Sequence, residues 1–233
     1  MHIIPVIDIK AGQAVLARQG QRHNYRPLCT PLCSSSHIDE VINAYLGIYS
    51  FTHFYLADLD ALMQTGSNHD LINSIIGHYP HLNFIIDSGL LKPDEIQKQS
   101  RHFTPVIGTE SIVEHDLSQL KQHSDNFILS LDFSSQDKLM GESQLYTSSK
   151  LWPRQLIIMT LGLVGKNSGP DLIKLAHFNQ NYPQHDFIAA GGIRHKQDLL
   201  QLMEVGIKAA LVASALHNGS LTDQDIQQLS VIG

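Results

Sequence analysis

The chain has few cysteines, no concentrated positive charge and no long apolar run. Its 233 residues include only 2 cysteines, Cys29 and Cys33, whose spacing fits neither a disulfide framework nor a four-ligand zinc site. The 14 histidines are scattered without the HxH or HExxH spacing of metal sites. We therefore expect no metal and no cofactor.

Charge and hydropathy narrow the class of ligand. The 16 Lys and Arg residues against 22 Asp and Glu residues, with no basic run, argue against binding to nucleic acid. No apolar run approaches the roughly 18 residues that span a bilayer, and the first residues, MHIIPVIDIK, do not resemble a signal peptide. We expect a cytoplasmic monomer or small homo-oligomer that acts on a small molecule.

Short apolar runs alternate with segments of helical periodicity. Unbroken apolar runs are typical of strands buried on both faces, as in a parallel sheet covered by helices. Eight such strand–helix units in 233 residues favour a closed (β/α)8 TIM barrel, the alternative being an open doubly wound sheet. The runs are IIPVIDI near residue 5, FYLADL near 56, NFIID near 85, TPVIG near 106, FILSLDF near 130, QLIIMT near 157, DFIAAG near 188 and AALVAS near 212.

The second half of the chain repeats motifs of the first half in the same order. PVIDI parallels LSLDF, YLADLD parallels IIMTLG, IIDSGLLKPDEI parallels IAAGGIRHKQDL, and VIGTES parallels LVASAL. No linker or change of composition divides the chain. We predict one α/β domain over residues 1–233, built from two similar half-barrels of roughly residues 1–122 and 123–233.

Polar residues at the carboxyl ends of barrel strands are candidates for chemistry. Asp8 and Asp132 end the first and fifth strands, so the twofold repeat would place them on opposite sides of the mouth. Two carboxylates in such positions can serve as acid and base when their pKa values differ. The alternative for each is a turn or helix-cap role. Asp58, Asp87 and Thr160 also end strands.

Glycine-rich turns after the last two strands predict a phosphate site. Backbone N–H groups of such turns at a helix N-terminus favour an anion. The corresponding turns of the first half are altered, and Asp87 stands where a glycine would help. At about 4 Å and an effective dielectric near 20, an ionised Asp87 would repel each unit of phosphate charge by roughly 4 kcal/mol. A second phosphate site is therefore expected to be absent, unless Asp87 points away or is protonated. The predicted phosphate ligands are Gly191, Gly192, Ile193, Ala213 and Ser214, and the further substrate-binding candidates of the first half are Asp58, Asp87, Ser88, Gly89, Gly108 and Thr109.

Two loops could contribute charge near the mouth. The segment LGLVGKNSGPDL could fold over a ligand, with Lys166 meeting negative charge, although an exposed lysine on a loop is an equal alternative. The segment GQAVLARQGQRHNYRPL is predicted to form a β-hairpin and a polar loop. Its side chains Arg18, Arg22, Tyr25 and Arg26 would then be available near the mouth, or simply exposed to solvent.

IIPVIDIKAG, YLADLDA, SLDF, VIGTES, SGPDL, AAGGIR and ASALHNG together resemble the HisA/HisF family of duplicated TIM barrels of histidine biosynthesis, nearly end to end. The DLDA form is closer to the isomerase branch than to the cyclase. The resemblance implies an Amadori rearrangement, in which an aminoaldose opens and becomes an aminoketose. It also implies that Asp8 is the general base, Asp132 the general acid at the ring oxygen, and Thr160 a supporting polar group.

Several motifs depart from that family. The family's GGG-V-R turn is DSG-L-L here, its TD pair is Thr160-Leu161, its early arginine is Leu16, and the glycine and basic residue of its last strand are Ala213 and Ser214. The family's isomerase binds a substrate with two phosphates. The chain is more similar to a HisA-like side branch found with genes of methanopterin-linked one-carbon metabolism.

Three functions remain open from the sequence. The first is a HisA-like isomerase or lyase acting on a singly phosphorylated sugar or pterin-type precursor. The second is the histidine-pathway ribotide isomerase itself. The third is a non-catalytic barrel used for binding or assembly, which has no need of the two opposed aspartates.

Overall fold

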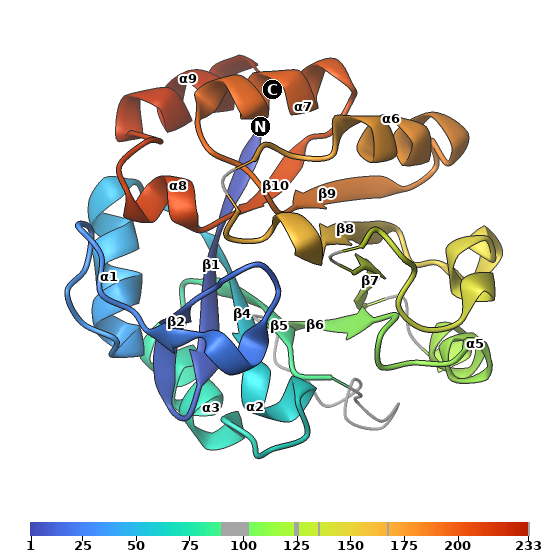
Figure 1. Ribbon diagram of the computed structural model, residues 1–233, viewed down its shortest axis with the longest axis horizontal. Coiled ribbons are helices and arrows are strands. Elements are labelled where there is room, and N and C mark those ends of the chain that lie inside the picture. The colour runs from blue at the N-terminus through green and yellow to red at the C-terminus, as the bar shows by residue number, and fades with distance from the viewer. Residues whose placement is uncertain (90–102, 124–125, 135, 167, 233) are drawn as a thin grey trace.

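Eight parallel strands close into a barrel in the computed structural model, which describes residues 1–89, 103–123, 126–134, 136–166 and 168–232 (Figure 1). Consecutive strands pair in parallel, and β10 pairs with β1, with Ile4 opposite Leu211, to complete the ring. This closure confirms the predicted TIM barrel and excludes the open sheet. The strands are β1 (His2–Lys10), β4 (His53–Asp58), β5 (Asn83–Asp87), β6 (Phe103–Gly108), β7 (Ile128–Phe133), β8 (Gln155–Thr160), β9 (Asp186–Ala190) and β10 (Ala209–Val212).

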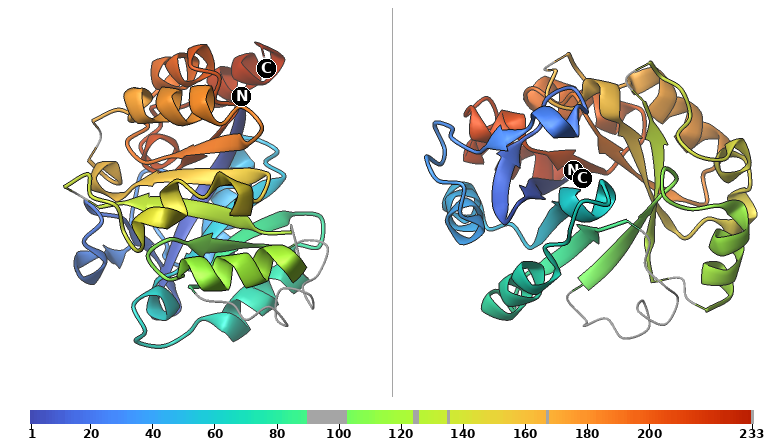
Figure 2. Two further views of the ribbon diagram at one scale, coloured as in Figure 1. Left: turned by 90° about the vertical axis from the view of Figure 1, so that its right-hand side faces the viewer. Right: turned by 60° about the horizontal axis from the view of Figure 1, so that its bottom comes forward.

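Helices cover the outside of the strand ring (Figure 2). Helices α1, α3 and α7 follow β3 (Arg26–Pro27), β4 and β9, in segments between the predicted strands where helical periodicity was expected. Residues 90–102, which include the predicted KPDEI segment, lie outside the described residues. The helices are α1 (Ile38–Ile48), α2 (Leu59–Leu62), α3 (His69–His78), α5 (Glu114–His123), α6 (Leu172–Asn181), α7 (Lys196–Glu204), α8 (Ser214–His217) and α9 (Asp223–Ile232), with 3₁₀ turns η1 (Arg22–Asn24), η2 (Ser143–Tyr146), η3 (Ser149–Leu151) and η4 (Leu161–Leu163).

The core consists of two separate hydrophobic layers, because successive side chains of a strand point to opposite faces. In β4, Tyr55 and Ala57 belong to the layer inside the barrel, whereas Phe54 and Leu56 belong to the layer beneath the helices. Each barrel strand follows the same alternation. The inner layer includes Ile4, Ile85, Val106, Ile128, Ile157, Ile188 and Leu211.

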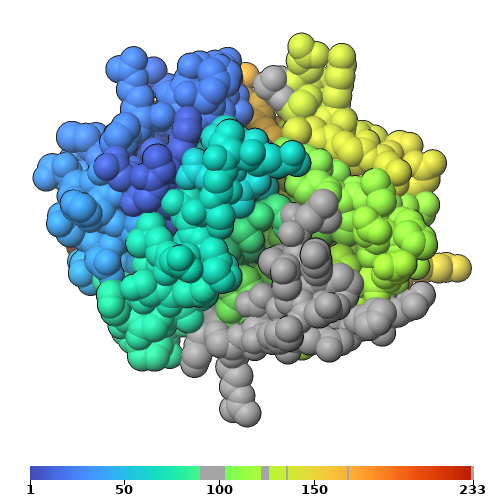
Figure 3. Space-filling model, turned by 90° about the horizontal axis from the view of Figure 1, so that it is seen from below, coloured from blue at the N-terminus to red at the C-terminus, as the bar shows by residue number. Residues whose placement is uncertain are grey.

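A short antiparallel extension follows β1 and carries a polar loop. Strand β2 (Gln13–Leu16) pairs antiparallel with β1, and β3 (Arg26–Pro27) pairs antiparallel with β2, so the segment contains the predicted hairpin. Between them lies η1, whose backbone carbonyl at Arg22 accepts a hydrogen bond of 3.0 Å from Lys10 Nζ. The blue N-terminal segment and the cyan segment of α2 share the face seen in Figure 3. The hydrogen bond from Lys10 therefore holds η1 beside the end of β1.

None of the helices in the described parts of the chain has the length and apolarity needed to cross a bilayer.

Candidate active site

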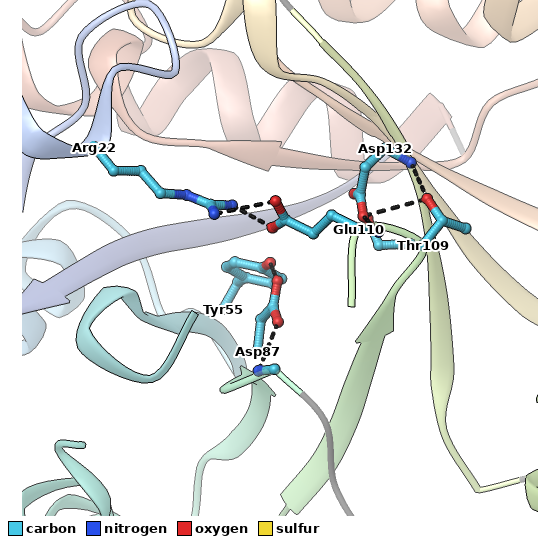
Figure 4. Close-up of polar contacts among 8 residues, drawn as sticks. Arg22, Tyr55, Asp87, Thr109, Glu110 and Asp132 are labelled. Atoms are coloured by element: carbon cyan, nitrogen blue, oxygen red, sulfur yellow. Dashed lines mark hydrogen bonds and ion pairs between the residues drawn. The ribbon is translucent and has the colours of Figure 1, made fainter. Parts of the chain in front are cut away.

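A pocket lies where the barrel strands end, and it is lined by four carboxyl groups. Asp8, Asp87 and Asp132 come from the ends of β1, β5 and β7, and Glu110 follows β6. Arg22 from η1 also lines the pocket (Figure 4). The carboxyl ends of the strands are where active sites of TIM barrels form. The geometry therefore supports a candidate active site at this mouth.

Asp132 is buried and held by its neighbours. Ser130 Oγ donates to its Oδ1 at 2.6 Å, and the backbone N–H of Glu110 donates to Oδ2 at 3.3 Å. The Asp132 backbone N–H donates to Thr109 Oγ1 at 2.9 Å, which fixes the strand end. Burial, together with the negative charge of Glu110, raises the pKa of Asp132 to about 8 against the opposing Ser130 bond. Near pH 7 this carboxyl is protonated and can donate a proton.

Gly108 leaves room for the Asp132 carboxyl. A Cβ atom at position 108 would lie 2.8 Å from Asp132 Oδ2, closer than such atoms approach. We expect Gly108→Ala to displace the carboxyl and to lower turnover at least about tenfold, because small misplacements of reacting groups cost rate. The matched control is Gly77→Ala in α3, where a Cβ would meet nothing within 4 Å. Equal turnover of the two variants would contradict this role of Gly108.

Asp8 is half-buried and faces the pocket from β1. Desolvation raises its pKa to about 7, the nearby positive charge of Arg22 lowers it, and the negative charge of Asp87 raises it. A carboxyl with this pKa is substantially ionised at neutral pH and can accept a proton. Burial therefore raises the pKa of both Asp8 and Asp132 toward neutrality, where a carboxyl can exchange a proton.

Arg22 forms an ion pair with Glu110 at the mouth of the barrel. Its two terminal nitrogens contact the two Glu110 carboxylate oxygens at 2.5 and 3.1 Å, and both side chains are largely buried. Such a two-bond pairing fixes orientation as well as charge. Of the four loop side chains that the sequence offered near the mouth, Arg22 and Tyr25 line the pocket.

Asp87 points into the pocket and is tied to a tyrosine inside the barrel. Tyr55 Oη donates to Asp87 Oδ2 at 2.9 Å, and the Gly89 backbone N–H lies 3.4 Å from Oδ1. Burial raises the pKa of Asp87 to about 6, and the bond from Tyr55 opposes that shift. The Asp87 carboxyl therefore faces the pocket, with a pKa raised toward neutrality.

The turn after β9 is built from glycines that no other residue could replace without movement. Gly191 and Gly192 have φ values of 104° and 82°. A Cβ at Gly192 would lie 2.1 Å from the carbonyl oxygen of Gly169, which closes over the turn with a 3.0 Å backbone bond. Gly191, Gly192 and Ile193 all line the pocket, as do Ala213 and Ser214 after β10. The predicted phosphate ligands therefore lie together.

One of the two helices after these turns differs from the expectation. The sequence placed a helix N-terminus directly at each turn, and α8, with 4 residues, does begin at Ser214, but α7 begins at Lys196, several residues after Gly192. A helix dipole therefore contributes little at Gly192. The reason is that Arg194 and Asp198 tie the intervening residues together through a 2.8 Å backbone-to-carboxylate bond.

Seven of the predicted site residues lie outside the pocket lining, namely Asp58, Ser88, Gly89, Gly108, Thr109, Thr160 and Lys166. Asp58 and Thr160 follow Ala57 and Met159, which face the interior, so both are directed to the outer layer by the strand alternation. Asp58 caps α2 and accepts bonds of 3.2 Å from the Ala61 backbone N–H and 2.7 Å from both nitrogens of Asn68. We therefore assign Asp58 a structural role and place Thr160 beside the site rather than in it.

The other predicted substrate-binding residues differ in how far they are buried. Thr109 is fully buried and contacts Asp132, whereas Lys166 is exposed and does not line the pocket, although Val164 and Gly165 of the same loop do. Ser88 is half-buried and Gly89 is buried beside Asp87. Three neighbours of these predicted residues lie outside the described residues, namely Leu90, Leu91 and Asn167.

Sequence reasoning did not single out Glu110 or Tyr55. Glu110 stands in the motif VIGTES, whose position after a strand was a usable signal, but its pairing with Arg22 joins residues 88 positions apart. Tyr55 reads as one more apolar residue of a buried strand. Tyr55 lies two residues before Ala57 on the same strand, and this spacing places both side chains on the interior face.

Cys29 is exposed and Cys33 is buried, and both are free thiols. Within the described parts of the chain, no three His, Cys, Asp or Glu side chains are arranged to hold a metal ion.

The fold and the pocket define a (β/α)8 barrel with paired carboxyl groups and glycine-rich turns at its mouth. The family model described as "Histidine biosynthesis protein" matches residues 2–222. The chain therefore belongs to this family, which is the HisA/HisF family that the sequence motifs resemble.

Curated relatives cover nearly the whole chain. An uncharacterized protein of Methanocaldococcus jannaschii is 32% identical over 97% of both chains. A Halothermothrix orenii protein is 25% identical over 98% of this chain and 99% of its own, and one from Thermus thermophilus is 23% identical over 95% and 96%. The latter two are named as phosphoribosyl imidazole-4-carboxamide isomerases. Isomerases of this family are thus among the relatives.

Proposed function

We propose that the protein is a HisA-like enzyme that uses Asp8 and Asp132 for acid–base catalysis on a phosphorylated sugar or a small molecule linked to one. The reaction is an isomerisation of the Amadori type or a related lyase step. The observation that carries this proposal is the pair of opposed strand-end carboxyls, whose pKa values of about 7 and about 8 suit a base and an acid near neutral pH.

The two aspartates can act in sequence on an aminoaldose. Asp132 donates its proton to the ring oxygen, so that the bond from that oxygen to the anomeric carbon breaks and an iminium forms. Asp8 then removes the proton from the neighbouring carbon, which gives an enolamine. Tautomerisation of the enolamine yields the aminoketose. The proton that Asp132 gives and the proton that Asp8 receives balance, so no outside reagent is needed.

A single phosphate would bind on the side of β9 and β10. The turns containing Gly192 and Ser214 line the pocket there, and backbone N–H groups of such turns can bind an anion. The side of β5 presents the carboxylate of Asp87, which disfavours a second phosphate. This asymmetry favours a substrate with one phosphate. A place in the biosynthesis of a one-carbon carrier cofactor, as the motif resemblance implies, would be consistent with such a substrate.

Phosphate binding can be located directly. We expect inorganic phosphate or ribose 5-phosphate to shift the backbone amide NMR signals of Gly192 and Ser214, while Ser88 and Thr109 stay unchanged. The reason is the repulsion of roughly 4 kcal/mol per unit charge near Asp87. Equal shifts at both pairs of residues would contradict the single-phosphate proposal.

A second candidate is the histidine-pathway ribotide isomerase. The isomerase names of two relatives, which contain two phosphoribosyl groups, favour it. Turnover of that ribotide by the purified protein separates the candidates. Turnover at a rate typical of enzymes, about 1 per second or more, would establish the second candidate. Without turnover, a melting temperature raised by ribose monophosphates would support the first.

A further inference from the structure

Burial acts alike on the two aspartates of the proposed function, so it does not decide which of them holds a proton near neutral pH. It is the largest cause of the raised pKa of both Asp8 and Asp132. The negative charge of Asp87 raises the pKa of both as well. A further charged neighbour separates them. The positive charge of Arg22 lowers the pKa of Asp8, and the negative charge of a glutamate, Glu110, raises the pKa of the other aspartate.

These two neighbours are the two halves of one ion pair. The Arg22 guanidinium contacts both carboxylate oxygens of Glu110, at 2.5 and 3.1 Å (Figure 4). The side chains are only 19% and 15% exposed, so salt and water screen this pair less than a pair on the surface. Although burial lowers the pKa of Arg22, its bonds and attraction to Glu110 raise that pKa above the usual value, and the guanidinium stays charged. The pocket therefore contains a dipole whose positive end lies on η1 and whose negative end follows β6.

Each end of this dipole is attached beside one of the aspartates. Lys10 Nζ donates to the backbone carbonyl of Arg22 at 3.0 Å, and Lys10 belongs to β1, the strand that carries Asp8. At the other end, the backbone N–H of Glu110 donates to Asp132 Oδ2 at 3.3 Å. Because both ends are held by hydrogen bonds, the dipole keeps its direction relative to the two carboxyls.

The other polar groups around the two aspartates leave this asymmetry in place. At Asp132, the Ser130 hydroxyl and the charge of Arg22 oppose the effect of Glu110, but the pKa of the carboxyl is raised all the same. Burial raises the pKa of the neighbouring tyrosines, so they are neutral near pH 7. These tyrosines are Tyr25, Tyr45, Tyr55 and Tyr146.

We propose that the ion pair of Arg22 and Glu110 is a positioning element that assigns the two aspartates their roles. Its negative end keeps the proton on Asp132, which can then donate it. Its positive end keeps Asp8 ionised, so that Asp8 can accept a proton. This inference rests on the proposed function, because it takes these two aspartates as the acid and the base. It adds two residues that act on the reaction through the aspartates.

Titration of individual carboxyl groups tests the inference without a substrate. In protein labelled at the aspartate carboxyl carbons, each carbon NMR signal moves as its group ionises, and the variants Asp8→Asn and Asp132→Asn identify the two signals by their loss. Glu110→Gln keeps the shape of the side chain and removes its charge. We expect the titration midpoint of Asp132 to fall by about one pH unit in Glu110→Gln, because its ionisation no longer places two negative charges together.

Two substitutions of Arg22 test the positive end. We expect Arg22→Gln to raise the titration midpoint of Asp8 by about one pH unit, because the carboxylate loses a nearby positive charge. Arg22→Lys keeps the charge and should return this midpoint most of the way to its value in the unaltered protein. The matched control is Arg154→Gln, which removes an arginine from an exposed ion pair with Asp186 and should leave both midpoints unchanged.

Three results would overturn the inference. The first is an unchanged midpoint of Asp132 in Glu110→Gln or of Asp8 in Arg22→Gln. The second is an equal shift of both aspartates in one direction in either variant, and the third is a midpoint of Asp8 that Arg22→Lys does not restore. All three leave the proposed function to its own test, the loss of turnover in Asp8→Asn. If one variant fails to fold, the variant at the opposite end still decides the outcome.

Discussion

Replacing Asp132 with Asn is expected to stabilise the fold at alkaline pH. The carboxyl has a pKa near 3.8 in the unfolded chain and about 8 in the folded protein. Below pH 3.8 Asp132 is protonated in both the folded and the unfolded chain, so its ionisation does not change the free energy of unfolding. As the pH rises toward 8, Asp132 ionises in the unfolded chain but not yet in the folded protein. The free energy of unfolding therefore falls by about 1.4 kcal/mol per pH unit. Above that point the penalty is complete, on the order of 6 kcal/mol, and Asn does not carry it.

Chemical denaturation at pH 4 and pH 9 measures this effect. The free energy of unfolding of Asp132→Asn should be close to that of the unaltered protein at pH 4 and should exceed it at pH 9. Asp70→Asn, which replaces an exposed carboxyl in α3, is the matched control and should show no such divergence. A difference between Asp132→Asn and the unaltered protein that is the same at both pH values would show that burial of this carboxyl is not destabilising.

Replacing Asp8 with Asn is expected to lower kcat by about a thousandfold, since general acid–base groups contribute roughly 10² to 10⁴. The amide keeps the size of the side chain but cannot accept the substrate proton. Turnover would be measured with the ribotide of the isomerase relatives.

The contrasting variant is Asp58→Asn. Asp58 also ends a strand, but its carboxylate accepts bonds from Ala61 and Asn68 beneath the helices. We expect this variant to lose stability by about 1 kcal/mol and to retain most of its kcat. If Asp8→Asn kept its turnover, the assignment of Asp8 as the base would be wrong.

The contrast between Asp8 and Asp58 also shows how far the sequence alone could reach. Eight apolar runs and their order were enough to predict the barrel, because strands buried on both faces need them. The strand ends were therefore located well. Which face of the strand each side chain at those ends lies on is decided by its spacing from the other residues of the strand, and the position of a strand end alone does not give this.

Because side chains two residues apart lie on the same face of a strand, this spacing separates the candidate residues that face the pocket from those that do not. Asp87 lies two residues after Ile85 and Asp132 four after Ile128, and both partners face the interior. Thr160 lies three residues after Ile157, which faces the interior, so its side chain is out of phase with the pocket. One residue of shift moves a side chain to the other face.

The hydrogen bonds between side chains of different elements could not be predicted in this way. The bond between Arg22 and Glu110 and the bond between Tyr55 and Asp87 join different elements, and their distances depend on how the barrel closes and where η1 lies. Strand periodicity carries no information on either. The pKa values of the aspartates depend on the same packing, because burial is the largest cause of each shift.

The pKa values of Asp87, Asp8 and Asp132 are about 6, 7 and 8, so the pocket can take up and release protons near neutrality. A ligand that arrives with a phosphate changes the charge around these aspartates, so protons pass between protein and solvent when it binds. The observed affinity then varies with pH even for a ligand that does not itself titrate. Its heat of binding includes the ionisation heat of whichever buffer takes up or supplies those protons.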